Sequence, residues 1–349
     1  MPVIQFDVRD LEALLGFKAR RDDLLTTIPM LGADVERVEG ERWGIEFFPD
    51  RPDLYSVEGI ARALRAFAGK KPGLRSYAVA KGKEIVRVEA SVKAVRPLIR
   101  GAVVTGLRFN DRRIQGLMEL QEDLHWGVGA RRRKASIGVH DKARLKAPYT
   151  YKAVGLHDVS FLPLQGTEEL TPGEILAKHP KGQAFAHLVK DNAPLLVDSA
   201  GKVLSFPPII NGTLTTVTEQ TRDVLVDVTG PDERAVTKAL ALVTTHLAEQ
   251  GGKVQSVTIQ EGTKRLVTPD LAPEPWKLRA ETVHELLGLD LTPAQIAKAL
   301  QRAGHGAKPS KSGVQVQVPC YRVDILHEVD LVEDVAIGHG YANFPYEKP

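Results

Sequence analysis

The sequence predicts an α+β protein of three domains: a small N-terminal α+β domain, a central mixed β-rich domain and a C-terminal winged-helix-like domain. The chain has 349 residues, more than one ordinary hydrophobic core supports. Val- and Ile-rich strand patterns fill the middle of the chain, and helical patterns are frequent at both ends. Proline- and glycine-rich segments separate these regions, so the predicted domains are 1–80, 85–265 and 270–349.

The N-terminal domain is expected to hold three helices and one strand. Helices are predicted over 7–16, 22–30 and 57–68, and a strand over 44–48. The run Arg51-Pro52-Asp53-Leu54 predicts a turn, and Ser56 is a suitable N-cap for the helix that follows.

The central domain is mostly β in pattern. Strands are predicted over 85–90, 101–107, 135–139, 195–206, 223–228 and 253–260. Two helices are predicted among them, over 114–126 and 232–249. The segment 148–188 contains several prolines and is expected to be an irregular excursion over the surface.

The C-terminal domain is predicted to combine helices with a β-hairpin. Helices are expected over 281–287 and 293–303, the second with Thr292 as N-cap and Pro293 in its first turn. The alternating run 314–318 predicts a strand, and Asp324 is expected to open an acidic helix. A small module of this kind is as often an adaptor as a reader of nucleic acid.

Composition limits the class of protein. With 43% hydrophobic and 26% charged residues, the chain has the composition of a soluble globular protein. Its one cysteine excludes an intramolecular disulfide and a cysteine zinc cluster. No targeting segment or membrane span is recognisable, so a cytoplasmic location is expected.

Charge is unevenly distributed along the chain. Residues 81–160 hold 17 Lys and Arg against 8 Asp and Glu. The basic run Arg131-Arg132-Arg133-Lys134, with Lys142, Arg144 and Lys146, is either a contact for nucleic-acid phosphates or a solvated face. Residues 324–334, in contrast, are acidic and attract cations.

Three groups of motifs follow one another along the chain and span nearly all of it. The first is RPDLYSVEG at 51–59, the second ASIGVHD at 135–141 with FPPIING at 206–212 and DVTG at 227–230, and the third lies over 322–341. They resemble, in this order, the B1, B3/B4 and B5 domains of the β subunit of archaeal and eukaryotic-cytosolic phenylalanyl-tRNA synthetases.

The resemblance implies a role in proofreading. In that family the α subunit performs aminoacylation, and this sequence has no class II motif with an ATP-binding arginine, so it is not expected to make aminoacyl-adenylate. Because the chain stops just after the B5-like region, we expect a fragment. Its partners are expected to be tRNA(Phe) and the α subunit, in a heterotetramer.

The resemblance also implies the residues of an editing pocket in the B3/B4 domain. They are Leu196, Ser205, Asn211, Gly212, Asp227 and Thr229. Asp227 either accepts the phenolic proton of a tyrosyl group or pairs with the α-amino group. Asn211 and the Gly212 amide could orient the ester carbonyl or stabilise an oxyanion, and Ser205 and Thr229 could position water.

No nucleophile with a base and an orienting group is evident, so direct attack by water on the ester is expected. His140 is an alternative general base, a contact for RNA or a residue that only turns the chain. Asn211-Gly212 is also an ordinary turn dipeptide, and Thr229 an ordinary residue before a helix.

Four carboxylates near the C-terminus predict a magnesium site. They are Asp324, Asp330, Glu333 and Asp334. Oxygen ligands suit Mg²⁺, and the resemblance implies a site shared with the α subunit. The alternative is a solvated acidic face with Asp324 as a helix cap.

Three other functions remain open from the sequence. A free-standing deacylase would share the pocket but should lack the first and third motif groups, which are both present. A nucleic-acid-binding regulator would use the winged-helix-like end and the basic run. A non-catalytic structural subunit would keep the domains without the chemistry.

Overall fold

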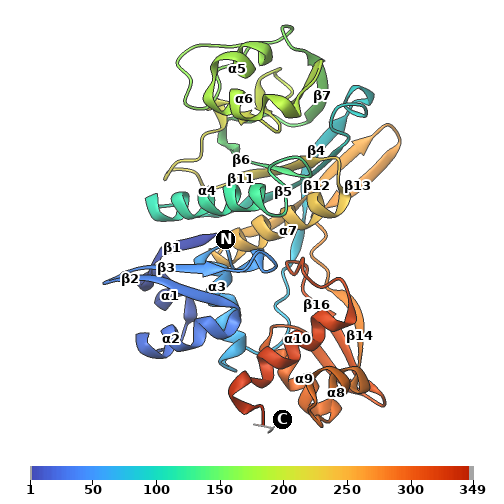
Figure 1. Ribbon diagram of the computed structural model, residues 1–349. Helices are drawn as coiled ribbons and strands as arrows, with labels where there is room; N and C mark the ends of the chain where they lie inside the picture. Colours follow the sequence, from blue (N-terminus) through green and yellow to red (C-terminus); the bar gives the residue numbers. More distant parts are fainter. Residues whose placement is uncertain (1, 346–349) are drawn as a thin grey trace. The chain divides into compact units, whose positions relative to one another are not determined.

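The structure, a computed structural model, describes residues 2–345 and divides into two compact units. One unit comprises Met1–Tyr77 and Leu271–Pro349, and the other Ala78–Asp270 (Figure 1). The second unit has nearly the limits predicted for the central domain, whereas the first and third predicted domains share one unit. The predicted mixed α+β class is confirmed.

The N-terminal part of the first unit is a three-stranded antiparallel sheet, in the order β1-β3-β2, with helices. Its elements are β1 (Val3–Asp7), α1 (Val8–Leu15), α2 (Arg21–Thr27), η1 (Ile28–Leu31), β2 (Ala33–Glu39), β3 (Arg42–Phe47), η2 (Pro52–Leu54) and α3 (Val57–Phe67). The predicted cap of α3 is confirmed, because Ser56 Oγ accepts a hydrogen bond from the Gly59 amide at 3.2 Å.

The C-terminal part of the same unit is a second three-stranded sheet, in the order β14-β16-β15, covered by helices. Its elements are β14 (Glu274–Arg279), α8 (Ala280–Leu287), α9 (Pro293–Arg302), β15 (Gly306–Ser310), β16 (Gly313–Val318), α10 (Glu328–His339) and η7 (Tyr341–Asn343). Helix α10 is capped by His327, so the prediction that it opens at Asp324 is wrong. Arg322 holds Asp324 in an ion pair instead.

The second unit is built on a ten-stranded sheet, in the order β10-β9-β8-β7-β4-β12-β5-β11-β6, with β13 paired to β12. The strands are β4 (Val79–Val88), β5 (Leu98–Thr105), β6 (Ser136–Asp141), β7 (Tyr149–Gly155), β8 (Asn192–Val197), β9 (Val203–Phe206), β10 (Ile210–Asn211), β11 (Val224–Gly230), β12 (Lys253–Glu261) and β13 (Lys264–Thr268). The single strand predicted over 195–206 is therefore a hairpin of two.

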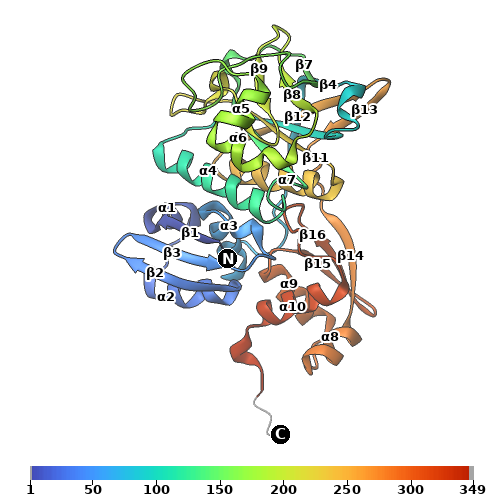
Figure 2. The ribbon, with the colours of Figure 1, turned by 45° about the horizontal axis from the view of Figure 1, so that its top comes forward.

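Helices cover this sheet in two places. They are α4 (Asp111–Trp126), α5 (Pro172–Lys178), α6 (Pro180–Phe185) and α7 (Glu233–Glu249), with short 3₁₀ turns η3 (Ala90–Val92), η4 (Lys142–Arg144), η5 (Ala186–Leu188) and η6 (Thr213–Thr215). Helix α7 packs on β5 and β11, and α5 and α6 lie beside β8 and β9 (Figure 2). The segment predicted to be irregular thus contains β7, α5 and α6.

The hairpin of β8 and β9 is buried on both faces. Leu196 and Leu204 belong to one hydrophobic cluster, and Leu195 and Val203 belong to another on the opposite face. Burial of one such leucine stabilises the fold by roughly 1.5 to 3 kcal/mol. This hairpin is therefore a rigid support for the β9–β10 turn that follows it. Within residues 2–345, the helices are all too short or too polar to span a lipid bilayer.

Candidate functional site

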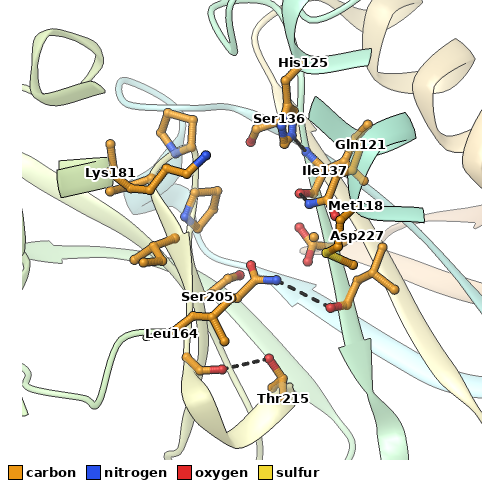
Figure 3. Close-up of a pocket in the computed structure, with 18 of the residues that line it drawn as sticks. Met118, Gln121, His125, Ser136, Ile137, Leu164, Lys181, Ser205, Thr215 and Asp227 are labelled. Carbon is orange, nitrogen blue, oxygen red and sulfur yellow. Dashed lines mark hydrogen bonds between the residues drawn. The ribbon is translucent and has the colours of Figure 1, made fainter. Parts of the chain in front are cut away.

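A cavity of about 310 Å³ lies in the second unit, between the β9–β10 turn and the β6–β11 strand pair (Figure 3). Ser205 and Asp227 lie on its opposite walls, with helix α4 completing one side. The two walls come from the two ends of the sheet order, so the curled sheet brings its ends together at this point. A long hydrogen bond of 3.4 Å from Asn211 Nδ2 to the Val139 carbonyl joins them.

The first wall is a row of residues on neighbouring strands. In the antiparallel register Leu196 pairs with Ser205, and Ser205 pairs with Asn211. Ser205 and Asn211 line the cavity, whereas Leu196 is fully buried in the hydrophobic core beside them. The Ser205 hydroxyl is buried and has no hydrogen-bond partner among residues 2–345, so it is available to a ligand.

The second wall presents Asp227 on β11, opposite Gly138 on β6. The buried Asp227 carboxylate contacts His140 Nε2 at 2.6 Å, and His140 Nδ1 contacts Thr215 Oγ1 at 2.9 Å. A Cβ atom on Gly138 would lie 2.4 Å from Asp227 Oδ1, so glycine leaves the space that this carboxylate occupies. His140 was weighed from the sequence as a base, but it does not line the cavity.

The structure places Thr229 behind this wall and not in the cavity. Its hydroxyl is 2.9 Å from Arg96 Nε and 3.0 Å from Ser136 Oγ, and its side chain is fully buried. Burial lowers the pKa of Arg96 to about 10, because the low-dielectric interior disfavours its charge. Thr229 therefore holds a buried arginine, and it is not among the groups that could position water in the cavity.

The Gly212 amide is also occupied within the fold. It donates a hydrogen bond of 2.7 Å to the Leu204 carbonyl, so the expectation that it could stabilise an oxyanion is wrong. Gly212 still lines the cavity, and a Cβ there would lie 2.8 Å from the Val203 carbonyl. Its contribution is close packing of the turn, while the amide groups of Asn211 and the hydroxyl of Ser205 remain as polar donors.

A charged cluster at the α4 side was not found from the sequence. Glu122 lies 2.7 Å from Arg132 and 3.0 Å from Lys181, and all three line the cavity. Burial raises the pKa of Glu122, but the contacts with His125 and Arg132 outweigh burial and lower it. Burial lowers the pKa of His125 to about 4, so this imidazole is neutral and its Nε2 accepts the Ile137 amide at 2.8 Å. The helix pattern of α4 gave no sign that these residues meet.

The basic run proves to be divided between two roles. Arg132 is buried and donates to the Pro208 and Ile209 carbonyls at 3.0 and 2.9 Å. It therefore holds the β9–β10 turn and cannot contact phosphates. Its neighbours Arg131 and Arg133 are exposed. The backbone at 130–132 has positive φ angles of 47°, 56° and 65°, a strained conformation that the buried guanidinium anchors.

The four predicted magnesium ligands are placed apart from this cavity, in the first unit. Asp334 contacts His305 at 2.7 Å and Arg322 at 2.8 Å, and Asp324 also pairs with Arg322. Asp330 accepts the Leu326 and His327 amides at 2.7 Å each. Among residues 2–345, no three His, Cys, Asp or Glu side chains converge as metal ligands. In this arrangement the carboxylates do not fit a magnesium site. The binding of magnesium by this chain therefore stays an untested prediction.

The sequence was compared with protein families and with known proteins. Residues 276–341 match the tRNA synthetase B5 domain family. The chain is 50% identical to the phenylalanine–tRNA ligase β subunit of Methanosarcina acetivorans and 47% identical to that of Archaeoglobus fulgidus, with all of this chain covered. It spans 64% and 63% of the lengths of those relatives.

A solved structure matches over almost the full chain. It is the crystal structure of an N-terminal fragment of the phenylalanyl-tRNA synthetase β subunit from Pyrococcus horikoshii, with a TM-score of 0.93 and 35% identity. The match covers 97% of this chain and 100% of that one. The chain therefore belongs to the phenylalanyl-tRNA synthetase β-subunit family.

Proposed function

We propose that this chain is the editing portion of a phenylalanine–tRNA ligase β subunit, which hydrolyses tyrosyl-tRNA(Phe). One observation carries the proposal: Asn211 and Asp227 line one cavity, with the unpartnered Ser205 hydroxyl beside them. These are the polar groups needed to hold an amino-acid ester, and the cavity lies between the ends of a rigid sheet.

The need for a second site follows from the chemistry of selection. An apolar pocket that accepts phenylalanine rejects an isostere with one added hydroxyl by only about 10²-fold. A cavity whose buried polar groups require that hydroxyl discriminates in the opposite sense, because phenylalanine would leave them unpaired. The cavity combines such groups with apolar walls from Met118 and Ile137.

In the proposed reaction, a water molecule attacks the ester carbonyl carbon and the bond to the ribose oxygen breaks. The products are tyrosine and tRNA with a free terminal hydroxyl, to which a proton from the water passes. Asn211 and Ser205 orient the ester and the water, and Asp227 accepts either the phenolic proton or a hydrogen bond from the α-ammonium group. Catalysis would be largely positional, with assistance from the neighbouring tRNA hydroxyl.

The partners proposed are tRNA(Phe) and the α subunit of the heterotetramer. The exposed Arg131 and Arg133, beside the cavity-lining Arg132, are suited to RNA phosphates. For the α subunit, the support is that the similar proteins are named as β subunits.

The test is hydrolysis of charged tRNA by the purified chain. We expect release of tyrosine from tyrosyl-tRNA(Phe), little release of phenylalanine from phenylalanyl-tRNA(Phe), and loss of both selectivity and rate in Asn211→Ala and Asp227→Ala. Met30→Ala, an exposed change in the first unit, should leave the rate unchanged. Equal release from both esters, or unchanged rates in the two cavity variants, would exclude the proposal. Tight binding of duplex DNA without hydrolysis would favour a regulator.

A further inference from the structure

We propose that His140 is a positioning residue that holds the Asp227 carboxyl group fixed on the cavity wall. The inference rests on the proposed function and names the device that prepares its principal polar group. Asp227 lines the cavity, whereas His140 lies behind it and is fully buried. His140 therefore acts on a bound ester only through Asp227.

The contacts around the imidazole ring form a chain of three hydrogen bonds. Asp227 Oδ1 lies 2.6 Å from His140 Nε2, Nδ1 lies 2.9 Å from Thr215 Oγ1, and that hydroxyl donates to the Gly212 carbonyl at 3.1 Å. Both ring nitrogens are thus occupied, so the ring cannot flip without losing a partner. The chain ties Asp227 to the turn that carries Asn211.

Proton accounting along this chain assigns the roles. A hydroxyl has one proton, and Thr215 gives it to the Gly212 carbonyl, so His140 Nδ1 must be the donor to Thr215. The short contact from Nε2 to Asp227 then requires a second proton between them. This shared proton makes the contact a short hydrogen bond, which fixes the orientation of both buried side chains.

The surrounding backbone leaves room for this pair and for no larger group. A Cβ on Gly138 would lie 2.4 Å from Asp227 Oδ1 and 2.6 Å from His140 Nε2. The cross-strand partner of Asp227 on β6 is this glycine, and His140 follows two residues later on the same face. Because Oδ1 is engaged by His140, we assign the remaining Asp227 oxygen, Oδ2, as the acceptor for the ester.

This assignment predicts how substitutions should behave. His140→Leu removes the hydrogen-bond partner of Asp227 and leaves this side chain free to rotate, so hydrolysis of tyrosyl-tRNA(Phe) should fall by about 10²-fold, mainly in kcat. His140→Gln keeps an N–H donor near the Nε2 position and should retain most of the rate. In an Asp227→Asn background, His140→Leu should add nothing, because its effect passes through the carboxylate.

The experiment measures hydrolysis by the natural chain and the four variants (His140→Leu, His140→Gln, Asp227→Asn and the double variant), together with calorimetric binding of a non-hydrolysable 3′-(tyrosylamino)adenosine. Melting temperatures check folding, and Thr215→Val, which frees Nδ1, serves as a second variant if His140→Leu does not fold. Loss in His140→Leu, rescue in His140→Gln and no further loss in the double variant support the proposal. An unchanged rate in His140→Leu, or additive losses in the double variant, overturns it.

The two proposals fail separately. If the natural chain binds the tyrosyl probe but hydrolyses no ester, editing is excluded, while weaker probe binding by His140→Leu than by His140→Gln still supports the positioning role. If it neither binds nor hydrolyses, both are overturned.

Discussion

Asn211 on β10 and Asp227 on β11 line the same cavity although β9, β8, β7, β4, β12 and β5 lie between them in the order of the sheet. The site is therefore made by the curl of the sheet and not by neighbouring strands. A substitution that separates the two ends of the sheet should therefore move Asn211 and Asp227 apart and remove the site, even where neither residue is itself changed.

Gly138→Ala should break the proposed site from behind. Its Cβ would lie well inside contact distance of both Asp227 and His140, and overpacking of this kind costs about 2 kcal/mol. We expect a lower free energy of unfolding in urea and loss of tyrosyl-ester hydrolysis.

The matched control is Gly116→Ala, in the interior of α4. Apart from its chain neighbours and the nearby backbone of its own helix, no atom lies within 4 Å of a Cβ at that position, and alanine favours a helix over glycine by about 0.5 to 1 kcal/mol. This variant should gain stability and keep its activity. Equal effects of the two substitutions would contradict the account given for Gly138.

Arg132→Met should loosen the β9–β10 turn. The substitution removes the hydrogen bonds to the Pro208 and Ile209 carbonyls and the ion pair with Glu122, and leaves the strained backbone without its anchor. We expect the free energy of unfolding to fall by about 3 kcal/mol. Arg133→Met, in the same loop but exposed, should change it by less than about 0.5 kcal/mol. Similar losses in both would show that Arg132 has no anchoring role.

Local structure was predictable where one short pattern determines it. Ser56 and Thr292 cap their helices as expected, since a cap depends on three or four consecutive residues. The α7 helix begins after Asp232, its predicted first residue, for the same reason.

What depends on distant partners could not be predicted. Arg132 belongs to a basic run in the sequence, yet its partners are carbonyl groups 76 and 77 residues away. Thr229 follows Asp227 by two residues and so shares its face of β11, but its hydroxyl contacts Arg96 and Ser136, and it does not line the cavity. The acidic run 324–334 suggested a metal because its arginine partner, Arg322, lies just outside it.

Asp334→Asn should destabilise the first unit. The carboxylate is buried between His305 and Arg322, and although burial opposes it, Arg322 lowers the pKa of Asp334. Removing this charge leaves a buried arginine undercompensated, so we expect a loss of about 3 kcal/mol in urea unfolding.

The neighbouring Glu333 gives a control of opposite sign. Burial and the nearby Asp50 and Asp334 charges raise the pKa of Glu333, so its ionised form is disfavoured in the fold. Glu333→Gln should therefore be neutral or slightly stabilising at pH 7. If both substitutions cost the same, the ion pair with Arg322 does not explain the burial of Asp334.

Acid should weaken the second unit through His125. The pKa of this imidazole is about 4 in the fold, against 6.5 for an ordinary histidine, because burial disfavours its charged form. Between these values the unfolded chain binds a proton that the folded chain does not, so the free energy of unfolding falls as pH falls. The loss between pH 7 and pH 5 is about 2 kcal/mol from this group.

His125→Gln keeps an acceptor for the Ile137 amide but cannot be protonated. The free energy of unfolding of this variant should therefore fall by about 2 kcal/mol less than that of the natural chain over the same pH range. His305, whose pKa is also lowered by burial, acts in the same direction in both proteins and cancels in the comparison. The measurement is urea unfolding of both proteins at pH 7 and pH 5, and parallel losses would show that His125 is not held neutral beside the cavity.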